Sequence, residues 1–257
     1  MIQWIRFRHH DEIGFGTLEN GDINVHTGDM FGAAQPNGQH LALQDVDLLA
    51  PSQPSKIIAL WNNFHALAAK LKVPEPQEPL YLLKAPTTAA PPNGAIERPP
   101  SYDGKVVYEG ELGIVIGRTC SRVPVDRADA FIHGYTCVND ITAADIITRD
   151  ATFAQWARAK GFDSFCPFGP VISSGIEPAR LVVRTVLNGV ERQSYPIADM
   201  IFSVQQLVSK ISHDMTLLPG DLICCGTSLG VGAMKDRTNT VSVAIEGIGE
   251  LTNEFRN

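Results

Sequence analysis

Short apolar segments separated by turn-forming residues run through most of this chain and limit the folds it can adopt. Helical patterns are fewer and do not alternate regularly with the strand-like segments, so a doubly wound parallel sheet is disfavoured. The pattern predicts a mixed, β-rich α+β fold. The expected strands are 2–7, 13–18, 23–26, 56–61, 111–117, 135–138, 181–187, 222–225 and 240–245, and the expected helices are 62–72, 126–133, 142–159 and 203–211.

Two stretches rich in proline divide the chain. The segment Pro51–Ser55 suggests a boundary between a small N-terminal β subdomain, residues 1–54, and a larger domain, residues 55–257. Residues 74–100 hold eight of the 17 prolines, so this segment should be extended and irregular apart from the apolar stretch Tyr81–Lys84. A loop this long is either functional or a peripheral crossover.

Charge and composition exclude several classes of function. The chain has 257 residues, 21 of them basic and 28 acidic, and a net charge of -7. This excess of acidic groups disfavours a nucleic acid or an anionic membrane as a partner, and no apolar run approaches the length of a membrane span. Five cysteines without a CxxC pair, and a start without an apolar signal segment, indicate a reduced, cytoplasmic protein.

One short motif suggests a serine hydrolase. Gly226–Gly230 matches the G-x-S-x-G pattern, with Ser228 as the nucleophile. That fold needs a helix after the serine and a histidine later in the chain, but the following residues are poor helix formers and the last histidine is His213. The order of residues therefore argues against a serine hydrolase. Dinucleotide-binding, Walker, zinc-protease and EF-hand patterns are absent.

Three carboxylates lie at the ends of expected strands. Glu109 and Glu111 are two residues apart, so their side chains share one face of a strand, and Asp140 ends the next strand-like segment. Carboxylates this close repel one another unless a cation lies between them, and three of them suit a hard divalent ion such as Mg²⁺. From spacing alone, the simpler interpretation is a solvated strand edge for Glu109 and Glu111 and a helix N-terminus for Asp140, and the metal site stays open as the alternative.

Longer motifs in a constant order resemble a known family. Tyr108–Gly117 is similar to the YEGEL-x-VVIG segment of the fumarylacetoacetate hydrolase (FAH) family, which includes acylpyruvate hydrolases and 2-hydroxyhepta-2,4-diene-1,7-dioate isomerases. Gly134–Asp140 is similar to its GYT-x-x-ND segment. Further similar segments follow in the family's order within residues 55–257: Lys160–Asp163, Phe168–Pro170, Leu187–Gly189, Asp199–Phe202, Leu218–Asp221, Gly226–Gly232 and Glu246–Gly249.

The resemblance implies a mixed β-roll catalytic domain, a Mg²⁺ or Mn²⁺ cofactor and a homodimer. By position, Glu109, Glu111 and Asp140 would be the metal ligands. Lys160 would lie beside the metal and contact a small anionic 2-oxo acid, and Thr227 would bind its carboxylate. Lys84 is assigned with them to substrate binding, and His65 with Lys160 to catalysis.

The chain departs from the family pattern in two places. Hydrolytic members carry G-x-N-Y-x-x-H-x-x-E, in which the His and Glu activate water, but here the histidine, His65, is followed by Ala68 in place of the Glu. Trp61 replaces the Asn of this pattern, and Ala144 replaces the Arg of a second pattern that follows Asp140. An alanine cannot orient an imidazole or accept a proton, so Glu75 or Glu78 could serve as a substitute base.

Three functions are compatible with these observations. The first is metal-dependent hydrolysis of a C–C bond in an acylpyruvate or 2-oxo dicarboxylate, through a metal-stabilised enolate, in the breakdown of aromatic compounds. The close alternative is decarboxylation or isomerisation of an oxaloacetate-type or 2-hydroxydienedioate substrate at the same site. A protein that binds a metal and a 2-oxo acid without turnover is the third.

Overall fold

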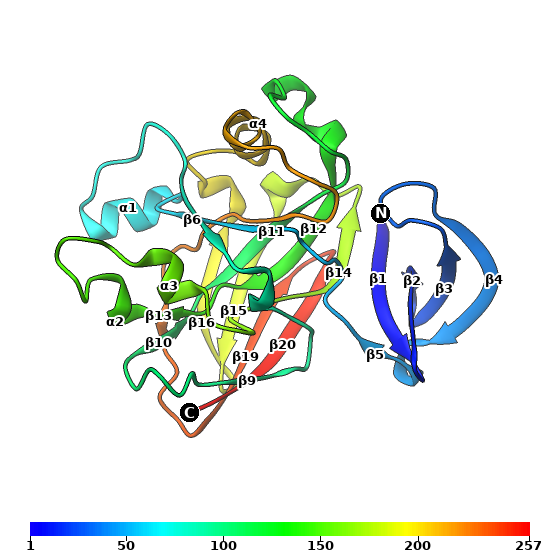
Figure 1. Cartoon of the computed structure of the whole chain (residues 1–257), viewed down its shortest axis with the longest axis horizontal. Coiled ribbons are helices and arrows are strands. Elements are labelled where there is room, and N and C mark those ends of the chain that lie inside the picture. Colours follow the sequence, from blue (N-terminus) through cyan, green and yellow to red (C-terminus); the bar gives the residue numbers. More distant parts are fainter.

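Strands rather than helices build most of the structure, a computed structural model that describes all 257 residues (Figure 1). The largest sheet has 12 strands in the order β4-β3-β2-β1-β14-β12-β11-β17-β6-β7, with β5 paired to β1 and β8 paired to β14. Its strands are β1 (Ile2–His9), β2 (Glu12–Glu19), β3 (Asp22–Thr27), β4 (Gln35–Ala42), β5 (Asp47–Leu48), β6 (Ile57–Trp61), β7 (Leu80–Lys84), β8 (Ala89–Ala90), β11 (Gly110–Ile116), β12 (Ile132–Asn139), β14 (Cys166–Ser174) and β17 (Leu222–Cys224).

Two smaller sheets and a few short helices complete the molecule. One sheet contains β13 (Thr142–Ala143), β10 (Val106–Tyr108) and β18 (Gly232–Ala233). The other contains β16 (Val190–Pro196), β15 (Val182–Leu187), β19 (Thr238–Ile245), β20 (Gly249–Arg256) and β9 (Ala95–Glu97). The α-helices are α1 (His65–Leu71), α2 (Ala144–Ile147), α3 (Trp156–Lys160) and α4 (Val204–Asp214), and short 3-10 helices cover Leu43–Asp45, Pro86–Thr88, Val125–Phe131, Pro178–Arg180 and Ile197–Asp199.

The N-terminal strands form a group at one side of the molecule. Figure 1 shows β1 to β5 to the right of the remaining elements, and α1, α2 and α3 on the opposite side. Asn20 and Gly21 connect β2 to β3 with positive φ values of 51° and 84°, which is the tight hairpin turn that this dipeptide predicts. The first strand pairs with β14, with Trp4 opposite Ile172, so this group continues the large sheet.

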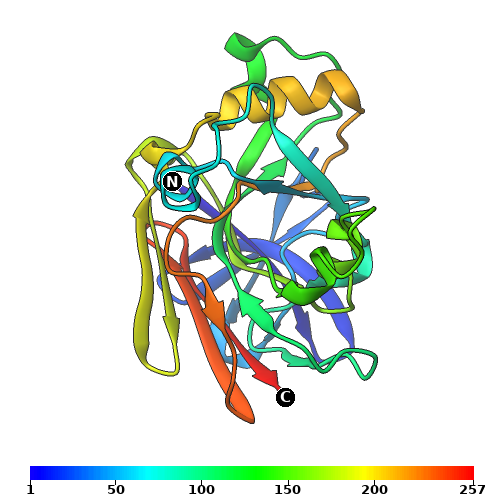
Figure 2. The same ribbon diagram turned by 90° about the vertical axis from the view of Figure 1, so that its left-hand side faces the viewer.

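The largest core lies between the central strands, the β15–β19 sheet and α4. The strand β11 is buried along its whole length, which explains its continuous apolar sequence. The helix α4 begins at a capping box formed by Ser203 and Gln206 and packs Leu207 and Ile211 into the same core. Figure 2 shows this helix lying across one end of the sheet.

The expected β-rich α+β fold is confirmed, but one long helix was wrongly predicted. The segment 142–159 forms two short helices, α2 and α3, instead of one. The Asp150 Oδ1 atom accepts hydrogen bonds from the backbone N and the hydroxyl of Thr152, and this local turn competes with helix formation between them. The expected helix 126–133 is a 3-10 helix that ends at Phe131. None of the helices has the length and apolar character needed to cross a membrane.

Candidate metal centre

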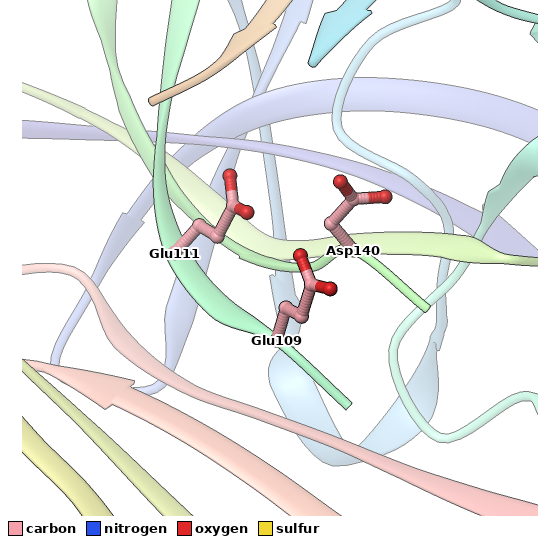
Figure 3. Close-up of side chains that lie close together, drawn as sticks. All are labelled: Glu109, Glu111 and Asp140. Atoms are coloured by element: carbon pink, nitrogen blue, oxygen red, sulfur yellow. The ribbon is translucent and has the colours of Figure 1, made fainter. Parts of the chain in front are cut away.

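Two neighbouring strands bring three carboxylates together. Glu109 immediately precedes β11, Glu111 is its second residue, and Asp140 immediately follows β12. The two strands are antiparallel neighbours, with Gly110 opposite Asn139, so both carboxylate-bearing ends meet. One oxygen from each carboxylate lies within 4.8 Å of the other two, and Figure 3 shows the three groups converging on a common space. The sequence predicted all three carboxylates, and strand pairing brings them together.

Backbone contacts hold these side chains in register. The Asp140 N–H donates to the Glu109 carbonyl at 2.8 Å, and the Glu109 N–H donates to Asn139 Oδ1 at 3.0 Å. Gly110 separates the two glutamates because a Cβ there would lie 2.0 Å from Thr185 Oγ1. A side chain at this position would displace β11 from β15, and with it both glutamates.

Two lysines face the carboxylates. The Lys160 Nζ atom, at the end of α3, donates to Glu109 Oε2 at 2.8 Å, to Asp140 Oδ2 at 2.7 Å and to Thr142 Oγ1 at 2.7 Å. The Lys84 Nζ atom donates to Asp140 Oδ1 and, at 3.0 Å, to the Phe165 carbonyl. The Lys84 side chain is fully buried, as is that of Asp140. Lys160 therefore lies on the carboxylates where the sequence predicted it, while Lys84 is enclosed behind Asp140.

The pKa values of this cluster differ because the cations are unevenly shared. Burial alone would raise the pKa of Asp140, but Lys160 and Lys84 outweigh it and hold that pKa below its usual value. Burial, with Asp140 and Glu109 nearby, raises the pKa of Glu111 well above its usual value. The Lys160 pKa is raised by the carboxylates of Asp140, Glu109 and Glu111, which together outweigh its own burial. The proton on Lys160 is thus firmly held, whereas burial and the neighbouring carboxylates oppose ionisation of Glu111.

The residues fit a divalent cation. Three carboxylates face only two ammonium groups, and an added cation would balance the negative charge of the fully ionised triad. The Glu111 Oε2 atom accepts the Gly226 N–H at 2.8 Å, but its Oε1 atom is buried without any hydrogen-bond partner. A buried, unpaired carboxylate oxygen is costly, and a metal ion would satisfy it. The all-oxygen donor set is that of a hard ion.

Polar side chains missed by the sequence interpretation surround Thr227. The Thr227 Oγ1 atom donates to the Gly110 carbonyl at 3.1 Å and accepts a hydrogen bond from Gln193 Nε2 at 2.8 Å. The Gln193 Oε1 atom accepts the Gly110 N–H at 3.0 Å, and the Tyr195 hydroxyl donates to the Gly110 carbonyl. Gln193 and Tyr195 alternate with exposed residues on β16, so their polar sequence carried no signal of burial. They link Thr227 to the strand that bears the glutamates.

His65 lies away from the triad but has a carboxylate partner. It begins α1, and its Nδ1 atom is 2.6 Å from Glu75 Oε1. Their side chains are 49% and 52% exposed, respectively. Of the two acidic residues considered as substitutes for the family Glu, Glu75 is the one that contacts His65. Ala68, which stands at the family position of that Glu, is a buried residue of α1.

The serine-hydrolase hypothesis finds no geometric support. Ser228 is buried, and its Oγ atom has no hydrogen-bond partner. The His213 Nδ1 atom is instead 2.8 Å from the Ser209 carbonyl within α4. A serine nucleophile needs a base within hydrogen-bonding distance, and Ser228 has none.

The fold and the site define a β-rich protein with a buried acidic centre suited to a divalent metal. Comparison with known proteins then identifies its family. Residues 56–256 match the family described as fumarylacetoacetate (FAA) hydrolase C-terminal, and residues 3–51 match the one described as Rv2993c-like, N-terminal. The chain belongs to the FAH family, as its motifs suggested, and members of this family are enzymes.

Three similar proteins carry the names of isomerases or of a tautomerase. The structure of a 2-hydroxyhepta-2,4-diene-1,7-dioate isomerase from Mycobacterium marinum is 39% identical, with a TM-score of 0.91 over 100% of this chain and 98% of that one. A 5-carboxymethyl-2-hydroxymuconate delta-isomerase from Mycobacterium smegmatis is 39% identical, with a TM-score of 0.90 over 99% of each chain. Oxaloacetate tautomerase YisK from Bacillus subtilis is 37% identical over 227 residues, 83% of this chain and 74% of the relative.

Proposed function

We propose that this protein is a Mg²⁺- or Mn²⁺-dependent enzyme that tautomerises or isomerises a 2-oxo acid by moving a proton at the carbon beside the oxo group. The observation that carries the proposal is the buried triad of Glu109, Glu111 and Asp140, which faces Lys160 and leaves one carboxylate oxygen unpaired. The names of three relatives, two isomerases and a tautomerase, support this class of reaction.

The donor set favours Mg²⁺ or Mn²⁺ because it contains only carboxylate oxygens. When bound, the ion would act as a Lewis acid on the 2-oxo group and make the adjacent C–H bond more acidic. The protein's own side chains would then bind the anion, orient it and carry the proton.

Lys160 is the side chain placed to hold the anionic part of the substrate. Its ammonium group already contacts Glu109 and Asp140, and it would provide the positive charge that an anion needs inside an acidic protein. Thr227, held by Gln193, would turn its hydroxyl from the Gly110 carbonyl to the substrate carboxylate. Lys84 has no free surface, and we assign it the task of orienting Asp140.

His65 and Glu75 form the candidate proton-transfer pair. Glu75 contacts Nδ1 of the imidazole, so Nε2 is left free to take or give a proton. A carboxylate that accepts a hydrogen bond from Nδ1 fixes the orientation and tautomer of the imidazole. In this chain, Glu75 would therefore orient His65 for proton transfer. The family pattern gives that role to a Glu at the position of Ala68.

C–C bond hydrolysis is the second candidate, and the same contact favours it. An imidazole oriented by a carboxylate is able to activate a water molecule, which hydrolysis needs and tautomerisation does not. The two reactions differ in their products, since hydrolysis adds one water and yields two acids, whereas tautomerisation leaves the mass unchanged.

A product-resolved turnover assay tests the proposal. Enol oxaloacetate, a 2-hydroxydienedioate and an acylpyruvate would be incubated with the protein and Mg²⁺ or Mn²⁺, and the products identified by mass and by loss of enol absorbance. We expect isomerisation without a change of mass, abolished by a chelator and by Glu111→Gln.

The controls separate the candidates. Cleavage to two acids would establish the second candidate in place of the first, and loss of CO₂ would identify a decarboxylase. Turnover that persists in excess chelator would contradict both proposals. Metal and 2-oxo acid binding without any turnover would indicate a binding protein.

A further inference from the structure

Two of the three tryptophans meet outside the apolar cores. Trp61 is the last residue of β6 and Trp156 the first residue of α3, and their ring centroids are 5.5 Å apart at an interplanar angle of 49°. Both side chains are partly exposed. Neither ring belongs to, or packs against, any of the four buried hydrophobic clusters. Core packing therefore does not account for this contact.

Sheet register places Trp61 beside the metal centre. Gly113 of β11 and Ala59 of β6 both pair with Cys224 of the intervening strand β17. Paired residues point to the same face of a sheet, and so do residues two apart within a strand. Gly113, Cys224 and Ala59 thus form one row across the three strands. Glu111 is two residues from Gly113 and Trp61 is two residues from Ala59, toward the same edge of the sheet, so both side chains point to one face. The two intervening strand spacings separate them by roughly 10 Å.

The second tryptophan approaches from the helix that carries Lys160. Trp156 and Lys160 are four residues apart on α3, so their side chains occupy one face, about one helical turn apart. Since Lys160 reaches Glu109 and Asp140, Trp156 lies about one helical turn from a residue that contacts the metal centre. The two indoles thus form a contact between the end of β6 and the start of α3, beside the carboxylates. We call this pair of rings the aromatic rim.

Four cations on β7, on α3 and between the helices α2 and α3 already have partners, which bears on the kind of substrate the aromatic rim accepts. Lys160 and Lys84 contact the carboxylates, Arg149 lies over the Tyr102 ring at 5.6 Å, and Arg158 donates to Gln155. Ala144 stands where the family pattern carries an arginine. A second carboxylate at the far end of a substrate would find indole rings here instead of a free cation. A planar apolar group would stack on the indole rings and would be removed from contact with water.

We propose that Trp61 and Trp156 determine substrate specificity by receiving a planar apolar group at the end of the 2-oxo acid remote from the metal. The preferred substrates are then 2-oxo acids with an aryl or conjugated hydrocarbon substituent, such as aroylpyruvates, rather than short 2-oxo dicarboxylates. This inference rests on the proposed function and narrows its substrate class.

Binding of two unreactive analogues tests the inference independently of turnover. Oxamate presents only the 2-oxo acid end, and N-phenyloxamate adds one phenyl ring to it. Calorimetric titration of the full chain in the presence of Mg²⁺ should show N-phenyloxamate binding about tenfold more tightly, as expected for one stacked and desolvated ring. In Trp61→Leu and Trp156→Leu this preference should fall to within about threefold, while oxamate affinity stays unchanged.

Matched variants exclude a purely structural effect. Trp61→Phe keeps an aromatic face and should keep the preference, and Trp4→Phe, in the N-terminal strands, should change neither affinity. The inference is overturned if the preference survives both leucine variants, or if each leucine variant weakens the two analogues equally. Kinetic measurements then separate the two proposals. A tryptophan-dependent preference without turnover of any 2-oxo acid would contradict the proposed function alone, whereas turnover with equal kcat/KM for aroylpyruvates and acetylpyruvate would contradict the inference alone.

Discussion

Lys160 and His65 make contacts of nearly equal length in different surroundings. The Lys160–Asp140 distance is 2.7 Å and the His65–Glu75 distance is 2.6 Å. The first pair has side chains that are 2% and 0% exposed, and the second has side chains that are 49% and 52% exposed. Buried charges lose their hydration and depend on one another, whereas exposed pairs contribute little to stability. Length alone therefore does not rank the two contacts, but burial does.

The comparison also separates their roles. The buried cluster holds three carboxylates against two ammonium groups, and one Glu111 oxygen is unpaired. This arrangement is better suited to binding a cation than to stabilising the fold. The exposed pair costs little to form and to break. It is therefore suited to proton exchange with a substrate or with solvent.

Replacing Glu111 with Gln should have the largest effect. The side chain keeps its size but loses its charge, so metal binding and about 10³-fold or more of kcat/KM should be lost. The metal-free protein should be as stable as before, because the pKa of Glu111 is already raised by burial. Turnover and thermal unfolding, each with and without Mn²⁺, measure both effects. Full activity in the variant would contradict the assigned metal site.

Removing the cation of the buried pair should cost stability as well as activity. Lys160→Met leaves Glu109 and Asp140 buried without their shared partner, and the free energy of unfolding should fall by about 3–5 kcal/mol. Urea unfolding measures the loss, and Mn²⁺ should restore part of it. Lys70→Met, at an exposed position of α1, is the matched control and should change stability by less than about 0.5 kcal/mol. If Lys160→Met lowered the free energy of unfolding by less than about 1 kcal/mol, as for an exposed ion pair, the proposed difference between the buried and the exposed contact would be contradicted.

Breaking the exposed pair should affect activity and leave stability nearly unchanged. Glu75→Gln should lower kcat by about 100-fold, because His65 loses the carboxylate that orients it. The free energy of unfolding should change by less than about 1 kcal/mol. Glu78→Gln, in the same exposed segment, is the control, and equal kinetics for both variants would exclude Glu75 from proton transfer.

The smallest effect concerns a partly buried histidine that forms no ion pair. His133 lies between the rings of Trp4 and Phe31, its Nε2 atom has no hydrogen-bond partner, and burial lowers the pKa of His133. The unfolded chain then takes up this proton first, so stability should be full above about pH 6.5 and decline as the pH falls below it. In His133→Phe, unfolding measured from pH 5 to 7 should show a flatter decline. An unchanged decline would assign it to other groups.

The sequence predicted the carboxylate triad better than it predicted the contact between His65 and Glu75. The triad was predictable because the two-residue period of a strand is local, and the motifs around Glu109 and Asp140 placed the rest. The contact between His65 and Glu75 was open among alternatives, since the sequence did not show which acidic residue of the proline-rich segment turns toward α1. The helix over 142–159 failed because a turn at Asp150 outweighed its helical composition.

The sequence by itself determined nine of the 20 strands, the Asn20–Gly21 hairpin, the capping box of α4 and the pairing of Glu109 with Glu111, but not strands such as β14, β16 and β20. These features depend on residues within a few positions of one another. Only the tertiary structure decided that Lys84 is enclosed behind Asp140, that Gln193 supports Thr227, and that two tryptophans from β6 and α3 meet beside the carboxylates. Such contacts join distant parts of the chain, and they follow from strand register and packing rather than from local composition.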